Sequence, residues 1–229
     1  MALHLLETHT DQDFVNQSVA FLKDAITQAI SDRGVAIIGL SGGSTPKPIY
    51  EALGKQKIDW SKVWLFLVDD RYIRADDPKS NQFLLRSTLL KTAAIPESQL
   101  IFPDTTLPLP ACIKLYDRQM KDLMKKGQPN VITLGMGDDG HIASLFPPLM
   151  DGAFGPDAVI HTTTEKFDVF DRISTTMPVL TRARQSVFFL KGAGKKTVWE
   201  EMMGSGEDEK RWPAKELMNN TGMTIMGQW

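Results

Sequence analysis

Among the four histidines of this chain, His141 lies in the setting best suited to proton transfer. The stretch from Gly135 to Pro147 places it on a glycine-rich turn beside the carboxylates of Asp138 and Asp139. A free imidazole has a pKa near ~6.5, so at neutral pH it can take a proton from water and later return it to a leaving oxygen. These residue types indicate a general base. The plainer alternative is a structural histidine that hydrogen-bonds a loop backbone.

A second segment, Ser41–Thr45, has the composition of a phosphate-binding loop. It combines two glycines and three hydroxyl residues just ahead of a predicted helix. A helix N-terminus carries roughly half a positive charge and free N–H donors, which suits an anion. The Gly-Lys-Ser/Thr ending of a Walker A loop does not follow. An ordinary strand-to-helix turn capped by Thr45 would have the same composition.

A third segment, Asp69-Asp70-Arg71, places three charges directly after a continuously apolar run. Arg71 is suited to binding a substrate oxyanion, and one of the two carboxylates to handling a proton or orienting another group. The alternative is a solvated cluster with a local ion pair, which contributes about 0–1 kcal/mol when exposed.

The sequence also matches a nucleotide-binding motif, because Gly135, Gly137 and Gly140 fit the G-x-G-x-x-G pattern. Two carboxylates inside the match would repel a pyrophosphate, early prolines cut short the following helix, and the match does not open a βαβ unit. We therefore expect no nicotinamide cofactor. A metal site joining His141 to nearby carboxylates lacks recognisable ligand spacing, so no metal is expected either.

Alternating apolar runs and amphipathic segments must position these residues. We expect strands at 35–40, 63–68, 131–134, 187–190 and 224–229. We expect helices at 13–32, 46–53, 81–90, 112–125, 195–203 and 214–218. Phe83 is a candidate for the core in the 81–90 helix.

This alternation predicts an α/β fold: a mostly parallel central sheet with helices on both faces, in a Rossmann-like three-layer arrangement. Functional loops in such folds leave the carboxyl ends of the strands, so the three segments should meet at one edge. Neither Pro103–Pro110 nor Gly204–Lys210 divides the chain convincingly, and we expect residues 1–229 to form one domain.

Composition narrows the class of protein. With 229 residues, 42% hydrophobic residues and a net charge of −2, the chain has an ordinary globular composition and no general attraction for nucleic acid. No apolar run approaches the roughly 20 residues that span a bilayer, and no secretory signal is visible at the start. A lone Cys112 fits a reducing compartment, so we expect a cytoplasmic protein.

Together the segments resemble the 6-phosphogluconolactonase family, which shares a superfamily with the glucosamine-6-phosphate deaminases. The resemblance runs in order along nearly the whole chain. It is carried by Ser-Gly-Gly-Ser-Thr-Pro at 41–46, Asp-Asp-Arg at 69–71, Ser-Asn at 80–81, the run from 137 to 147, Arg-Ile-Ser at 172–174 with Pro178, and Gly-Ala-Gly-Lys at 192–195.

Two features favour the lactonase branch. The deaminases typically continue the Asp-Gly-His-Ile-Ala motif with Phe-Asn-Glu-Pro, where this chain has Ser144-Leu145-Phe146-Pro147. They also tend to carry tyrosine where Arg71 stands. The chain departs from the lactonase pattern at two positions, since Asp70 replaces a usual Glu and Pro148 a usual Gly.

The resemblance implies hydrolysis of 6-phospho-D-glucono-1,5-lactone in the oxidative pentose phosphate pathway, without metal or organic cofactor. His141 would activate the attacking water, and Arg71 or loop N–H groups would stabilise the oxyanion. Either Asp139 or Asp69 would orient the imidazole. The phosphate would rest on Gly42, Gly43, Ser44 and Thr45, with Arg172 and Lys195 as charge partners.

Other readings stay open at this point. An amino-sugar phosphate deaminase would use Asp69 to move a proton at C2, and a non-catalytic sugar-phosphate sensor would bind without chemistry. Neither a DNA-binding helix pair nor a basic tail supports the sensor. The expected partner is a phosphorylated sugar lactone, with no nucleic acid and no membrane. The sequence does not set the oligomeric state, for which a monomer is the starting expectation.

Overall fold

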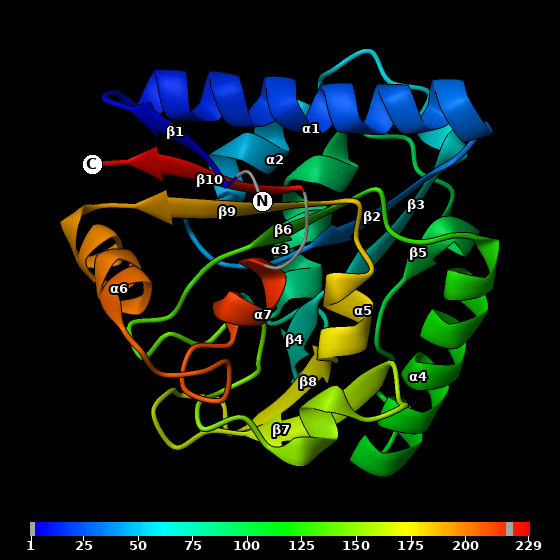
Figure 1. The fold of residues 1–229 in the computed structure, drawn as a ribbon. Helices are drawn as coiled ribbons and strands as arrows, with labels where there is room; N and C mark the ends of the chain where they lie inside the picture. Colours follow the sequence, from blue (N-terminus) through cyan, green and yellow to red (C-terminus); the bar gives the residue numbers. More distant parts are fainter. Residues whose placement is uncertain (1–2, 219–221) are drawn as a thin grey trace.

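Figure 1 shows the chain as a computed structural model, which describes residues 3–218 and 222–229. The strands are β1 (His4–Thr8), β2 (Ala36–Leu40), β3 (Val63–Leu67), β4 (Asp69–Arg71), β5 (Leu100–Ile101), β6 (Val131–Leu134), β7 (Val159–Thr163), β8 (Asp171–Thr175), β9 (Gln185–Lys191) and β10 (Met223–Gln228). The helices are α1 (Asp11–Arg33), α2 (Lys47–Leu53), α3 (Asn81–Ser87), α4 (Leu109–Lys126), α5 (Met177–Thr181), α6 (Ala193–Gly204) and α7 (Ala214–Met218).

A parallel sheet forms the centre of the described chain, with the strand order β1-β10-β9-β6-β2-β3-β5. The expected α/β fold is confirmed, and every strand expected from an apolar run is present. Two strands of this central sheet were not expected. β1 lies at the sheet edge with most of its residues exposed, and β5 has only two residues, so neither shows the continuous burial of an inner strand.

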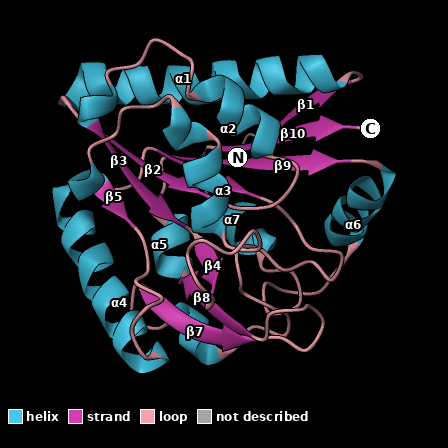
Figure 2. Ribbon diagram, turned by 180° about the vertical axis from the view of Figure 1, so that it is seen from behind, coloured by secondary structure: helices cyan, strands magenta, loops and turns pink. Residues whose placement is uncertain are grey.

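Helices cover both faces of this sheet (Figures 1 and 2). Successive strand residues point to opposite faces, so Ile37 and Phe188 enter the core beneath α4 to α7, whereas Ile38 and Phe189 enter the core beneath α1 to α3. The predicted three-layer arrangement is therefore correct. Across the described ranges, no helix combines the length and the apolar composition that crossing a membrane requires.

A smaller antiparallel sheet, ordered β4-β8-β7, lies on the side of the molecule away from α1 (Figure 1). Its presence corrects the expectation that Asp69–Arg71 is a loop. This segment pairs residue by residue with Arg172–Ser174 of β8. Three charged residues show no apolar alternation, so only the partner strand, a hundred residues on, reveals them as a strand.

Some helix boundaries differ from expectation, and at α1 capping explains the difference. α1 begins two residues earlier than expected because the Thr10 hydroxyl accepts a hydrogen bond from the Asp13 N–H at 3.1 Å. It ends at Gly34, whose φ of 74° is left-handed, as expected for a C-cap. α3 ends at Ser87, and Phe83, expected in the core, is 37% exposed because this helix turns its polar residues inward.

Gly39, in the middle of β2, gives a test of how closely the sheet is packed. A Cβ at this position would lie 2.5 Å from the Phe66 ring and 2.9 Å from the Ile132 side chain. We expect Gly39→Ala to lower the free energy of unfolding by about 1–3 kcal/mol, measured by urea denaturation. Gly204→Ala is the control, because a Cβ there meets open space at the end of α6. Equal stability of the two variants would contradict this packing.

Candidate active site

Three adjacent strands deliver the segments that the sequence singled out. β6, β2 and β3 lie side by side, and their carboxyl ends lead into Gly135–His141, Ser41–Thr45 and Asp69–Arg71. The chain proceeds from β2 outward through β3 and β5, then returns to the other side of β2 as β6. Ligands of open α/β sheets bind in the crevice at such a reversal of strand order, so the topology alone indicates this edge.

Asp69 joins these segments through a buried carboxylate. The Ser144 hydroxyl donates a hydrogen bond to its Oδ2 at 2.7 Å. The Asn81 amide donates to the Asp69 carbonyl oxygen at 2.9 Å and to Oδ1 at 3.3 Å. Gly42 lies directly against the Asn81 side chain, where any Cβ would collide with its amide. The three segments are therefore packed into one unit.

Asp70, the next residue, fixes the start of α3. Its fully buried carboxylate accepts hydrogen bonds from the N–H groups of Arg71 at 2.8 Å, Asn81 at 2.7 Å and Gln82 at 3.2 Å, and from the Ser80 hydroxyl at 3.1 Å. Burial raises the pKa of Asp70 to about 6, and these N–H donors limit the rise. The residue is structural: it caps a helix and holds Asn81 against Asp69.

His141 is held by Asp139. Its Nδ1 lies 2.6 Å from Asp139 Oδ1, and the same oxygen accepts the His141 backbone N–H at 3.2 Å. Burial acts to raise the pKa of Asp139, but the hydrogen bond and attraction of His141, together with Lys166, hold it well below its usual range. Of the two acids that the sequence left open, Asp139 is the one in contact with the imidazole. A proton on Nδ1 leaves Nε2 free to accept another.

The glycines of this turn serve the packing of side chains. The imidazole of His141 lies so close over Gly137 that a Cβ there would overlap the ring. Gly140, with a φ of 86°, lies beneath the Trp212 ring, 2.6 Å from where its Cβ would be. These contacts explain the glycines at 137 and 140, whereas a Cβ at Gly135 would meet open space.

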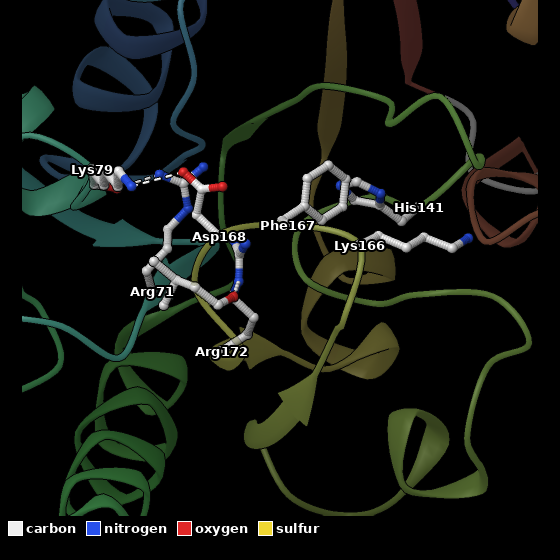
Figure 3. Close-up of a pocket in the computed structure, with 8 residues that line it drawn as sticks. Arg71, Lys79, His141, Lys166, Phe167, Asp168 and Arg172 are labelled. Carbon is white, nitrogen blue, oxygen red and sulfur yellow. Dashed lines mark hydrogen bonds and ion pairs between the residues drawn. The ribbon is translucent and has the colours of Figure 1, made fainter.

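His141 opens onto a cavity of about 370 Å³ that is rich in positive charge (Figure 3). Arg71 and Arg172 stand directly opposite one another in the β4–β8 pair. Like charges in this position are unfavourable unless an anion compensates them. Burial, followed by repulsion from Arg71, lowers the pKa of Arg172. Other residues lining the cavity are Lys79, Lys166, Phe167, Asp168 and Val169.

The predicted phosphate ligands are only partly gathered at this cavity. Arg172 lines it, but Ser44 and Thr45 line a separate hollow together with Lys191. Lys195 forms an ion pair with Asp138 at 2.6 Å and is not part of the lining. Gly42 packs on Asn81, and Gly43 has a left-handed φ of 105°. The phosphate role of this set stays a prediction.

Four charged or aromatic residues that line the cavity were missed from the sequence. Lys79 and Asp168 form an ion pair of 2.7 Å, and Lys166 and Phe167 lie beside His141 (Figure 3). Lys79 belongs to the loop before α3, and the other three to the tip of the β7–β8 hairpin. Neither loop carries a recognisable motif. The only signal was their nearness in sequence to the Ser80-Asn81 and Arg172 positions.

Comparison with known proteins agrees with this arrangement. The family described as glucosamine-6-phosphate isomerases/6-phosphogluconolactonase matches residues 9–226. The chain belongs to this family. A probable 6-phosphogluconolactonase of Dictyostelium discoideum is 45% identical over 217 residues, covering 93% of this chain and 92% of the relative. The 6-phosphogluconolactonase of Synechocystis is 34% identical, covering 89% and 86%.

Solved structures of the glucosamine-6-phosphate isomerase/6-phosphogluconolactonase family share the fold. A 6-phosphogluconolactonase from Plasmodium vivax superposes with a TM-score of 0.89 at 29% identity, covering 98% of this chain and 89% of that one. A monomeric glucosamine-6-phosphate deaminase superposes with a TM-score of 0.83 at 17% identity, covering 99% and 97%. Because both kinds of enzyme fit, the fold does not choose between the two activities.

The Ser144 hydroxyl provides a test of the Asp69 junction. We expect Ser144→Ala to lower the free energy of unfolding by about 1–3 kcal/mol, since the buried carboxylate loses a hydrogen bond. Ser18→Ala is a matched control, because the Ser18 hydroxyl is buried in α1 without a hydrogen-bond partner among the described residues. Calorimetry of both variants checks this. Loss of the same stability in both would refute the special role of Ser144.

Proposed function

We propose that this chain hydrolyses 6-phospho-D-glucono-1,5-lactone to 6-phosphogluconate, a step of the oxidative pentose phosphate pathway. The main support is the His141–Asp139 pair opening onto a cavity with two facing arginines. The 45% identity to a probable 6-phosphogluconolactonase over nearly the full length favours the same activity. A positively charged cavity suits a phosphorylated substrate.

The proposed reaction begins with a water molecule near His141 Nε2. The imidazole takes a proton as the water oxygen bonds to the lactone carbonyl carbon, and the carbonyl electrons move onto oxygen. The resulting tetrahedral oxyanion is stabilised by Arg71, whose buried Nε has no hydrogen-bond partner within residues 3–218 and 222–229. Such a donor contributes roughly 3–4 kcal/mol in other enzymes.

Collapse of the tetrahedral intermediate completes the reaction. The carbonyl re-forms, the bond between the carbonyl carbon and the ring oxygen breaks, and protonated His141 gives its proton to that oxygen. Asp139 keeps Nδ1 as the donor and stabilises the transient imidazolium. Asp69 has a supporting role, because its carboxylate holds Ser144 and Asn81 in place.

For the phosphate, we propose the Gly42–Thr45 loop, with Arg172 and Lys195 as charge partners. Lys195 sits in the first turn of α6, held by Asp138, and would exchange that carboxylate for the phosphate. We further propose a monomeric, cytoplasmic enzyme whose residues 1–229 act as one domain.

The environment of Asp69 argues against deaminase activity. In a deaminase this residue would move the proton at C2. It is 8% exposed, and both of its carboxylate oxygens accept hydrogen bonds. Lactone hydrolysis and ammonia release from glucosamine 6-phosphate, measured side by side, separate the two activities. Ammonia release without lactone hydrolysis would overturn the proposal.

The base assignment predicts a severe effect of His141→Asn. We expect kcat to fall about 10²–10⁴-fold while 6-phosphogluconate still binds, because only proton transfer is lost. Lactone loss followed by NMR, with the spontaneous rate subtracted, measures this. His161→Asn is the control, since His161 also pairs with an aspartate, Asp171 at 2.7 Å, but outside the cavity. Near-normal turnover in His141→Asn would eliminate the base role.

The phosphate assignment predicts a substrate-selective effect. Arg172→Ala and Lys195→Ala should each lower kcat/KM for the phosphorylated lactone about 10–100-fold, because a charge-assisted hydrogen bond is removed. Glucono-1,5-lactone without phosphate should be hydrolysed at nearly the wild-type kcat/KM. An equal loss on both substrates would show that these residues do not bind phosphate.

A further inference from the structure

The hairpin between β7 and β8 reaches back to the His141–Asp139 pair. Its tip is closed by a hydrogen bond from the Thr164 N–H to the Phe170 carbonyl at 3.1 Å. From this tip, Lys166 Nζ lies 3.1 Å from Asp139 Oδ2, whereas His141 contacts the other oxygen, Oδ1. One carboxylate thus bridges an imidazole and an ammonium group.

Two further contacts hold the tip in this position. The Phe167 ring meets the His141 ring edge-on at a centroid distance of 5.4 Å, and Phe146 packs against the same imidazole at 4.7 Å. On the far side of the cavity, Asp168 pairs with Lys79 at 2.7 Å (Figure 3). The hairpin is therefore anchored on both sides of the cavity, which keeps Lys166 within reach of Asp139.

We propose that Lys166 is a positioning residue, which shares Asp139 with His141 and thereby keeps the imidazole in its neutral, proton-accepting form at neutral pH. This inference rests on the proposed function, because it concerns the readiness of the same base. A carboxylate alone stabilises an imidazolium ion and so favours premature protonation. An ammonium group on its second oxygen offsets that attraction while leaving the orienting hydrogen bond intact.

The other charges around the pair do not replace Lys166. Arg211 Nη1 donates to the Asp139 backbone carbonyl at 2.9 Å, and Asp138 is taken up by Lys195. The charged groups that face His141 or Asp139 from the surrounding elements are Arg71 of β4, Arg172 of β8, Lys79 before α3, Asp168 and Lys166 of the hairpin, Lys195 of α6, Asp138 and Arg211. Among them, Lys166 is the side chain that forms an ion pair with the Asp139 carboxylate.

The exposure of Lys166 predicts that its effect on His141 depends on salt concentration. The Lys166 side chain is 63% exposed and Asp139 only 15%. Salt therefore screens the contribution of Lys166, whereas the half-buried His141–Asp139 hydrogen bond is screened less.

The test is the pH profile of kcat/KM for Lys166→Met, Lys166→Arg and the wild type. In Lys166→Met the acid limb should move up by about 0.5 pH unit, a threefold loss of activity on that limb, with little change on the alkaline plateau. Lys166→Arg should restore the wild-type limb. In 0.5 M salt the difference between Lys166→Met and wild type should shrink.

Lys125→Met is the matched control, because it removes the same charge from an ion pair with Asp122 on α4, away from the cavity. An acid limb that stays in place in Lys166→Met, or that moves equally in Lys125→Met, would overturn the inference while leaving lactone hydrolysis standing. A uniform fall at all pH values would also overturn it, since that pattern indicates a merely structural role.

An NMR titration of the His141 ring, assigned with His141→Asn, supplies a second readout that needs no turnover. Proton uptake at higher pH in Lys166→Met than in wild type supports the inference, and identical titrations refute it. If the wild type fails to hydrolyse the lactone, the proposed function falls, and this titration alone decides the role of Lys166.

Discussion

The carboxylate of Asp69 accepts hydrogen bonds from Ser144 and Asn81, which belong to two segments far apart in the chain. It is 8% exposed, so these bonds form in a medium where an unpaired carboxylate would be strongly unfavourable. The loop after β6, the start of α3 and the end of β3 are consequently held in one arrangement. Gly42 completes it by leaving room for Asn81. The position of His141 depends on this junction, because Ser144 follows it by three residues.

From this junction the rest of the cavity follows by strand pairing. Asp69 opens β4, and β4 pairs with β8 so that Arg71 faces Arg172. Two arginines in register repel each other, and an anion bound between them would offset this repulsion. The β7–β8 turn then carries Lys166 and Phe167 back over the imidazole. A small sheet thus places cations and an aromatic ring around His141.

Local patterns in the sequence were sufficient to predict the five inner and longer strands of the central sheet, but not the edge strands β1 and β5. Continuous apolar runs such as Val63–Val68 identify strands that are covered on both faces, and glycine and proline mark where they end. The three candidate segments could be placed at one sheet edge because the carboxyl ends of parallel strands meet there. The small sheet could not be predicted, since Asp69–Arg71 is recognisable as a strand only through its pairing with β8.

Side-chain partners were harder to predict than elements. Nothing in the spacing distinguishes Asp139 from Asp69 as the partner of His141, because one choice is local and the other depends on tertiary packing. In the structure the Asp139 carboxylate contacts the imidazole, whereas the Asp69 carboxylate accepts a hydrogen bond from Ser144. The contact of Lys166 with Asp139 and the ion pair of Lys195 with Asp138 could not be predicted from the sequence. Both join residues that are distant in the chain and meet only through the tertiary fold.

The most direct test of the central claim is a crystal structure of the protein with bound 6-phosphogluconate. We expect one carboxylate oxygen of the product, attached to the carbon that was the lactone carbonyl, to lie within hydrogen-bond reach of His141 Nε2, with Arg71 on the other oxygen. A complex in which the product's carboxylate contacts neither residue would contradict the assignment of His141 as the base.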